Sequence, residues 1–277
     1  MPHSTYLPEK MGTAVVQPVG SFEAGSFASF TLTYTAGYFG IDDTGSIKVV
    51  HRFASDMGRP QFDNPKAPNY VTVAASNGAI LHVEYDMKRN IRPWDKTIYI
   101  KVVRGFLREG DQIVINFGDR SGGSPGIRVQ TFCEDTFEFR VLVDAIAVYN
   151  YVELPRQPEI KIIPGKPVLW KAIVPSERCV GESFRLSLKG EDCWGNPSNQ
   201  CDQTFVLRAS TAICGLPASV TFTPGKFAVV LEDLSVSQAG DLTIDLLTDD
   251  GTPVATSNPL RIKTTTQLLP FWGDLHG

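Results

Sequence analysis

The sequence has no long apolar run and no recognisable leader. No stretch approaches the roughly 20 apolar residues that cross a bilayer, and residues 1–10 lack a basic start followed by an apolar run. We therefore expect no membrane partner. The sequence as given predicts a cytoplasmic location, or a periplasmic one if a leader was removed.

The sequence also has no large excess of positive or negative charge. Charged residues make up 20% of the 277 residues, and the formal net charge is only -4, without a long run of Lys or Arg. Proteins that bind nucleic acid gather positive charge on one face or stripe. The composition therefore argues against nucleic acid as a partner.

Familiar catalytic motifs are missing as well. The chain contains no Gly-x-Ser-x-Gly, no His-Glu-x-x-His and no dinucleotide fingerprint. A glycosidase with paired carboxylates leaves no local motif, because its two acids need not be close along the chain, and nothing here indicates one.

The cysteines match no zinc-ribbon spacing. There are five, so they cannot all pair, and four lie in the second half at positions 179, 193, 201 and 214. Reduced and mostly buried thiols are the leading interpretation. A bridge between Cys193 and Cys201 is the alternative, and a metal site comes last.

Short segments of alternating apolar and polar residues are what the chain does contain. Gly, Pro, Asn and Asp separate these segments, which is typical of strands with one buried and one wet face. No convincing helix of three turns is present. In the first half we predict strands at 30–35, 47–53, 70–74, 80–85, 98–103, 113–117 and 137–144.

Two prolines, Pro155 and Pro158, indicate a domain boundary, because proline removes a backbone donor and fixes φ. The fold class is therefore predicted as all-β, with two β-sandwich domains in tandem at 11–154 and 159–265. Residues 266–277 are predicted to be a linker and the first strand of a further, truncated domain. The second domain contains about seven short strands, which is typical of an immunoglobulin-like sandwich. Its predicted strands are 168–174, 183–188, 204–207, 218–222, 227–231, 242–247 and 259–263.

The last seven residues, 271–277, are the main candidate for chemistry. In a strand, Asp274 and His276 point to one face, and both are metal donors. A catalytic zinc takes about three protein ligands and a water, so two residues cannot complete a site. The alternative is an exposed tail whose histidine is incidental.

The segment Trp-Gly-Asp-Leu-His-Gly at 272–277 resembles the opening of the catalytic region in a family of bacterial proteins related to the PHP (polymerase and histidinol phosphatase) hydrolases. Residues 34–42 and 107–120 look similar to the same family. The resemblance implies that a metal-binding barrel begins here after a β-rich region, with a divalent metal in the full-length parent. Those proteins usually continue His-x-His, whereas His276 is followed by Gly277.

A glycine-rich loop at 118–128 is the second candidate. Its glycines could bring backbone amides to an anion while Arg120 and Arg128 clamp it. However, the loop lacks the Gly-Lys-Ser/Thr ending of a P-loop, so a mobile connection between strands is the leading interpretation. A lid over a neighbouring active site is a further alternative.

Histidines and aromatics give weaker candidates. His51 alternates with apolar neighbours and is expected to face the core or a sheet surface, and His82 shares a face with Glu84 without further ligands. Four aromatics beside turns either contact a sugar or partner or cap their own sandwich: Tyr38, Phe39, Trp94 and Trp194.

Two functions remain open from the sequence. The first is a non-catalytic N-terminal region that positions or shields a downstream metal-dependent hydrolase domain of the same polypeptide; we expect this chain alone to be catalytically silent and to hold no cofactor. The second is a carbohydrate- or protein-binding adhesion module of stacked sandwiches. A homo-oligomer is compatible with either.

Overall fold

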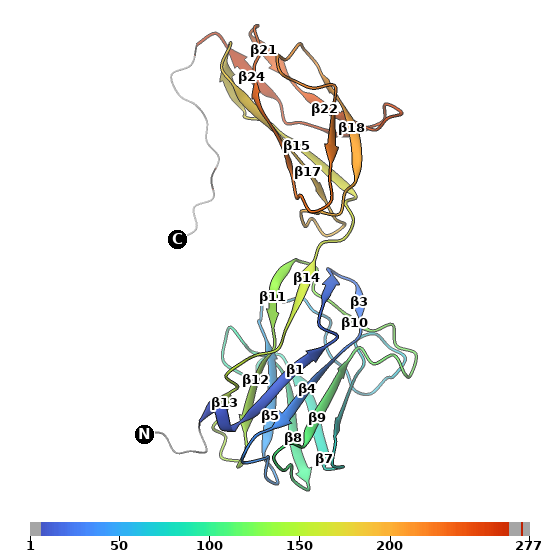
Figure 1. Ribbon diagram of the computed structural model, residues 1–277, viewed down its shortest axis with the longest axis vertical. Helices are drawn as coiled ribbons and strands as arrows, with labels where there is room; N and C mark the ends of the chain where they lie inside the picture. The colour runs from blue at the N-terminus through green and yellow to red at the C-terminus, as the bar shows by residue number, and fades with distance from the viewer. Residues whose placement is uncertain (1–6, 266–272, 274–277) are drawn as a thin grey trace. The chain divides into compact units, whose positions relative to one another are not determined.

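The computed structural model describes residues 7–265 and residue 273, and these form strands joined by turns (Figure 1). The helical element among them is a single 3-10 turn, η2 (Pro8–Lys10). Within the described residues there is consequently no helix with the length and apolar character needed to span a membrane. The predicted all-β class is confirmed.

The first compact unit, Met1–Ile163, contains two larger sheets and two small ones. The four-stranded sheet has the order β1-β4-β9-β6, and the five-stranded sheet has the order β13-β12-β5-β8-β7. The strands are β1 (Gly12–Gln17), β4 (Phe30–Ala36), β9 (Gln112–Phe117), β6 (Val71–Ala75), β13 (Val152–Glu153), β12 (Arg140–Asp144), β5 (Ser46–His51), β8 (Lys96–Arg104) and β7 (Ile80–Asp86).

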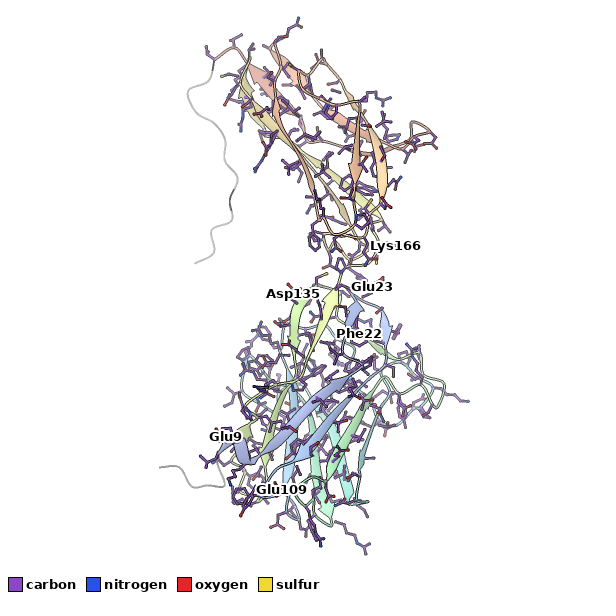
Figure 2. All side chains as sticks on the ribbon, viewed as in Figure 1. Glu9, Phe22, Glu23, Glu109, Asp135 and Lys166 are labelled. Atoms are coloured by element: carbon purple, nitrogen blue, oxygen red, sulfur yellow. The ribbon has the colours of Figure 1, made fainter. Side chains whose placement is uncertain are left out.

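The small sheets of this unit have the orders β11-β14-β2 and β10-β3. Side chains fill the space between the layers, and Phe22 and Glu109 lie at opposite ends of the unit (Figure 2). The strands are β11 (Glu134–Glu138), β14 (Glu159–Ile163), β2 (Ser21–Glu23), β10 (Ile127–Arg128) and β3 (Phe27–Ala28).

Aromatic rings join the layers of the first unit. Phe30 of β4 stacks on Phe117 of β9 at 4.9 Å between ring centroids, and both contact Phe139, at 5.8 Å and 5.2 Å. Phe139 also lies 5.1 Å from Phe137. Its side chain is fully buried, so this ring occupies the centre of the core.

Phe139 also explains a difference from the predicted strand at 137–144. The structure divides that segment into β11 and β12, which belong to different sheets. The chain crosses the core at Phe139, whose backbone N–H bonds to the carbonyl of Pro158. An unbroken alternation of apolar residues therefore concealed a change of sheet.

The predicted boundary at 153–158 lies before the division between the two units, which follows residue 163. β14 begins at residue 159, yet it pairs antiparallel with β11 and parallel with β2 of the first unit. Its Ile160 and Ile162 are buried in the first core. Pro155 and Pro158 thus interrupt a ladder inside one unit, and the second unit, Pro164–Gly277, begins after β14.

The second unit is a β-sandwich with the sheet orders β15-β17-β20, β16-β24-β21 and β19-β18-β22-β23. Trp170, Phe205 and Phe222 meet edge to face in its core, with centroids 4.4 to 5.8 Å apart. The strands are β15 (Leu169–Ile173), β16 (Glu177–Cys179), β17 (Phe184–Glu191), β18 (Gln203–Ala209), β19 (Ser219–Phe222), β20 (Val229–Leu234), β21 (Gly240–Leu242), β22 (Ile244–Leu247), β23 (Pro253–Thr256) and β24 (Leu260–Lys263).

No disulfide joins the five cysteines, all of which lie in the described part of the chain. Cys201 is buried, whereas Cys193 is exposed on the turn after β17. The structure thus favours free thiols over the alternative bridge between these two. The expectation that the thiols are mostly buried is wrong, because three of the five cysteines are exposed and one, Cys201, is buried.

Replacing Phe139 by alanine tests the central role of its ring. We expect the free energy of unfolding to fall by about 3–5 kcal/mol, because the substitution leaves a cavity where three other rings converge. Urea denaturation measures the loss. Phe132→Ala, at a 39% exposed ring, is the control and should cost about 1 kcal/mol or less. Equal losses in the two variants would contradict this account of the core.

Candidate functional site

The residues predicted to bind metal, Asp274 and His276, lie outside the described residues. Within the described ranges, no group of three or more His, Cys, Asp and Glu side chains gathers closely enough to hold a metal ion. The metal hypothesis stays a prediction. Among the described residues, the candidate binding site lies in the first unit.

Arg120 and Arg128 do not share a binding site. The Arg120 Nη2 atom donates to the carbonyl of Phe27, at 2.8 Å. Arg128 lies on β10, and its guanidinium contacts Asp56 instead. Of the two arginines predicted to hold an anion between them, Arg128 alone therefore remains a candidate.

The glycine-rich loop is tied down along its length. Asp119 accepts bonds from Thr72 and Ser121 at 2.7 Å and 2.9 Å. A Cβ at Gly118 or Gly126 would lie within 2.5 Å of the Ala28 carbonyl oxygen, and both glycines have positive φ. These close approaches explain the glycines by backbone packing, without an anion.

Arg128 opens onto a cavity of about 460 Å³ at the end of β7 and the start of β8. We call it the basic pocket. Three cationic side chains and one carboxylate line it, together with neutral residues: Arg59, Lys96, Arg128, Asp56, Met57, Gly58, Asn69, Tyr85 and Met87.

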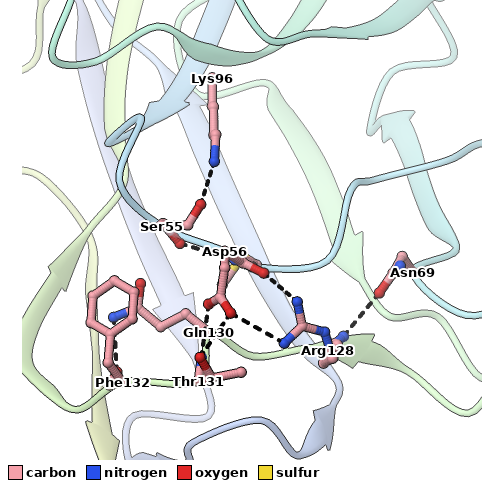
Figure 3. A network of polar contacts seen from close by, with 9 residues as sticks. Ser55, Asp56, Asn69, Lys96, Arg128, Gln130, Thr131 and Phe132 are labelled. Carbon is pink, nitrogen blue, oxygen red and sulfur yellow. Dashed lines mark hydrogen bonds and ion pairs between the residues drawn. The ribbon is translucent and has the colours of Figure 1, made fainter.

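Asp56 holds Arg128 in this pocket. Its carboxylate accepts the backbone N–H and the hydroxyl of Thr131, both at 2.8 Å, and lies 3.5 Å from Arg128 Nη1 (Figure 3). Burial acts to raise the pKa of Asp56, but the hydrogen bonds from Thr131 and the charge of Arg128 together lower it. Asp56 is therefore ionised at neutral pH, and much of its charge is already balanced.

Asn69 fixes the other side of Arg128. Its Oδ1 atom accepts the backbone N–H of Arg128 at 2.9 Å (Figure 3). Gly58 donates its backbone N–H to the Arg128 carbonyl at 2.8 Å. Asn69 has φ 65°, a left-handed conformation that asparagine tolerates better than most residues. A Cβ at Gly58 would lie 2.1 Å from Asn69 Oδ1, so only glycine permits this approach.

Lys96 forms the opposite wall. Its Nζ donates to the carbonyl of Ser55 (Figure 3). Burial lowers the pKa of Lys96; the charge of Asp95 opposes this shift and that of Arg59 adds to it. Because a desolvated ammonium favours a nearby negative charge, this wall is suited to an anion.

His51 lies behind the wall, opposite Lys96 in the β5–β8 pairing. It is buried, which is one of the two placements expected from the sequence, and burial together with the charge of Lys96 lowers the pKa of His51 to about 3. Its ring stacks on Tyr85, with centroids 6.5 Å apart. His51 is therefore neutral at physiological pH and supports the Tyr85 ring without adding charge.

Three groups in the pocket have unused donors. Arg59 makes no hydrogen bond or ion pair with any described residue, and neither Asn69 Nδ2 nor the Tyr85 hydroxyl bonds to a residue that the structure describes. Arg59 is exposed, and its charge is close enough to act on Tyr85 and Lys96. The pocket thus offers a ligand several hydrogen-bond donors that no described residue uses.

Sequence reasoning found Arg128 and missed Arg59 and Lys96. Arg59 stands between Gly58 and Pro60, a sequence that indicates only a turn, and Lys96 begins an ordinary strand. No local signal connects positions so far apart along the chain.

The other candidates lie elsewhere. His82 is exposed and 3.7 Å from Glu84. Trp94 contacts the guanidinium groups of Arg52 and Arg140, Tyr38 contacts Lys10, Phe39 packs on the first core, and Trp194 is half exposed on a turn of the second unit. None of these lines the basic pocket.

Comparison with known proteins adds little. No family model and no curated protein matches the chain. Among solved structures, it is similar to the adhesin InvE of Yersinia pseudotuberculosis, with 11% identity and a TM-score of 0.28 over 92% of this chain and 59% of that one. It is also similar to the seventh ScaB type I cohesin of Pseudobacteroides cellulosolvens, with 11% identity and a TM-score of 0.28 over 56% of this chain and 94% of that one.

The chain thus spans about 59% of the length of the adhesin chain. At a TM-score of 0.28, neither likeness says what this protein binds. The resemblance to PHP-related hydrolases receives no support from these comparisons and stays a prediction.

Replacing Gly58 by alanine tests the close approach to Asn69. We expect a loss of about 1–3 kcal/mol in the free energy of unfolding, because the new methyl group displaces the Asn69 side chain from the Arg128 N–H. Gly20→Ala is the control, since a Cβ there has no neighbour within 4 Å. Chemical denaturation of both variants gives the comparison, and an unchanged Gly58→Ala protein would show that the contact is dispensable.

The lowered pKa of Asp56 predicts a pH-dependent contribution to stability. A carboxyl whose pKa is lower in the folded state stabilises the fold above its unfolded value of 3.8, and this contribution is lost as the pH falls through the folded value. Asp56→Asn should therefore be less stable than the wild type at pH 7, and the difference should shrink below about pH 4. Urea denaturation from pH 7 to 3 tests this, with Asp63→Asn as the control; a difference independent of pH would contradict it.

Proposed function

We propose that this protein is a recognition module that binds an anionic ligand in the basic pocket of its first unit. The observation that carries the proposal is the excess of three cationic side chains over one carboxylate in the lining of one cavity. Asp56 pairs with Arg128, but Arg59 makes no ion pair with a described residue, so the pocket keeps a positive charge that an anion can meet.

The cavity has a suitable size and rigidity. Small-molecule sites are typically about 300–1,000 Å³ with a few placed polar groups, and this one measures about 460 Å³. Arg128 and Lys96 are held by bonds to neighbouring residues, which reduces the entropy lost on binding. A β-sandwich that carries such a pocket supports the alternative of a binding module.

The other hypothesis assigns the chain to the front of a metal-dependent hydrolase. It depends on Asp274 and His276, outside the described residues, and on a downstream catalytic domain. An anion-binding module is compatible with that arrangement, so the two proposals can be tested separately.

Arg59→Ala tests the binding proposal. Titration calorimetry with inorganic phosphate, acetate and tri-galacturonate should detect at least one ligand, and the variant should bind it about tenfold or more weakly, since a lost charge-assisted hydrogen bond is worth about 1.5–3 kcal/mol. Binding should also weaken with added salt.

The matched control is Arg104→Ala, an exposed arginine in a different cavity of the same unit. It should leave affinity and melting temperature unchanged. Arg59→Ala should not lower the melting temperature, since neither arginine side chain makes a hydrogen bond or ion pair with described residues. If no anion binds, or if Arg59→Ala binds as well as the wild type, the proposal is wrong.

A further inference from the structure

We infer that the ligand of the basic pocket is an acidic sugar, held by its carboxylate at Arg59 and Arg128 and by its ring against Tyr85 and Met87. This inference rests on the proposed anion-binding function and adds the chemical class of the ligand. Three features of the pocket support the inference: its balance of charges, its hydrogen-bond donors without a described partner, and its apolar wall.

The charge balance favours an anion with a single charge. Arg59, Lys96 and Arg128 face Asp56 within the lining, and two further carboxylates, Asp86 and Asp95, lie close enough to act on Tyr85. Asp56 pairs with Arg128, and the charge of Asp95 acts on Lys96, whereas Arg59 makes no ion pair with a described residue. One cation is thus left to meet one negative charge, which a carboxylate carries and which a phosphate group exceeds at about 1.5 to 2 charges.

The donors fit an oxygen-rich ligand. The guanidinium group of Arg59 donates no hydrogen bond to a described residue. A planar guanidinium group can bind a carboxylate through two parallel hydrogen bonds. Asn69 Nδ2 and the Tyr85 hydroxyl line the same cavity. A sugar hydroxyl can accept a hydrogen bond from Asn69 Nδ2, and it can donate one to the Tyr85 hydroxyl or accept one from it. A simple carboxylate such as acetate would use the arginines and leave these two groups unsatisfied.

An apolar wall completes the site. Tyr85 is held in place by its stacking on His51, and Met87 is 38% exposed. A pyranose ring has one face of C–H groups that can cover such a surface, and a thioether adapts to an irregular partner. This wall gives the body of the ligand a contact that free phosphate cannot use.

The test compares ligands that differ in one feature at a time. Calorimetry on the full chain would measure tri-galacturonate, its methyl ester, acetate, inorganic phosphate and the peptide Gly-Gly-Gly. We expect tri-galacturonate to bind best, and its ester, which lacks the negative charge, to bind about tenfold or more weakly. Met87→Ala should weaken tri-galacturonate and leave acetate unchanged, while Arg59→Ala weakens both.

Each other outcome has a distinct meaning. Phosphate or the peptide binding more tightly than tri-galacturonate, with dependence on Arg59, would overturn the sugar assignment and leave the anion-binding function standing. Acetate binding as tightly as tri-galacturonate would overturn the contact with the ring. If no probe binds to a wild-type protein with a cooperative melting transition, the sugar assignment and the anion-binding function both fail.

Discussion

The basic pocket depends on a constraint of backbone hydrogen bonding. Between β5 and β6 the chain runs from residue 52 to residue 70 without a strand, and a buried backbone group without a partner costs free energy. The segment bonds to Arg128 on β10 and to Thr131 just after it: Asp56 and Asn69 supply side-chain acceptors, and Gly58 supplies a backbone donor. The interactions that hold the segment therefore also place the charges.

One consequence is that like charges are held together at the pocket. Arg128 is partly neutralised by Asp56, but Arg59 and Lys96 stand close enough for one to lower the pKa of the other. The buried histidine avoids adding a further charge by remaining neutral. Arg59 makes no ion pair with a described residue, so its charge is the one most available to an anionic ligand.

Much of the fold could be predicted from the sequence, and the errors have one origin. The alternation from residue 137 to residue 144 correctly indicated extended chain, but the change of sheet at Phe139 depends on which neighbours pair with each half. Pro155 and Pro158 correctly indicated a broken ladder, but β14 returned to the first unit because its two isoleucines had a core to enter. In the site, sequence reasoning identified Arg128 but paired it with Arg120, and it did not identify Arg59 or Lys96.

The sequence by itself determined the class of this protein. Side-chain alternation has a period of two residues, and proline and glycine act on their own backbone, so both signals are local and can be read without a partner. The tertiary structure decided which sheet each strand joined and which charges met at the pocket. Positions 59, 96 and 128 come together through hydrogen bonds and a core that form only when the chain is folded, and this is why no stretch of sequence contains the site.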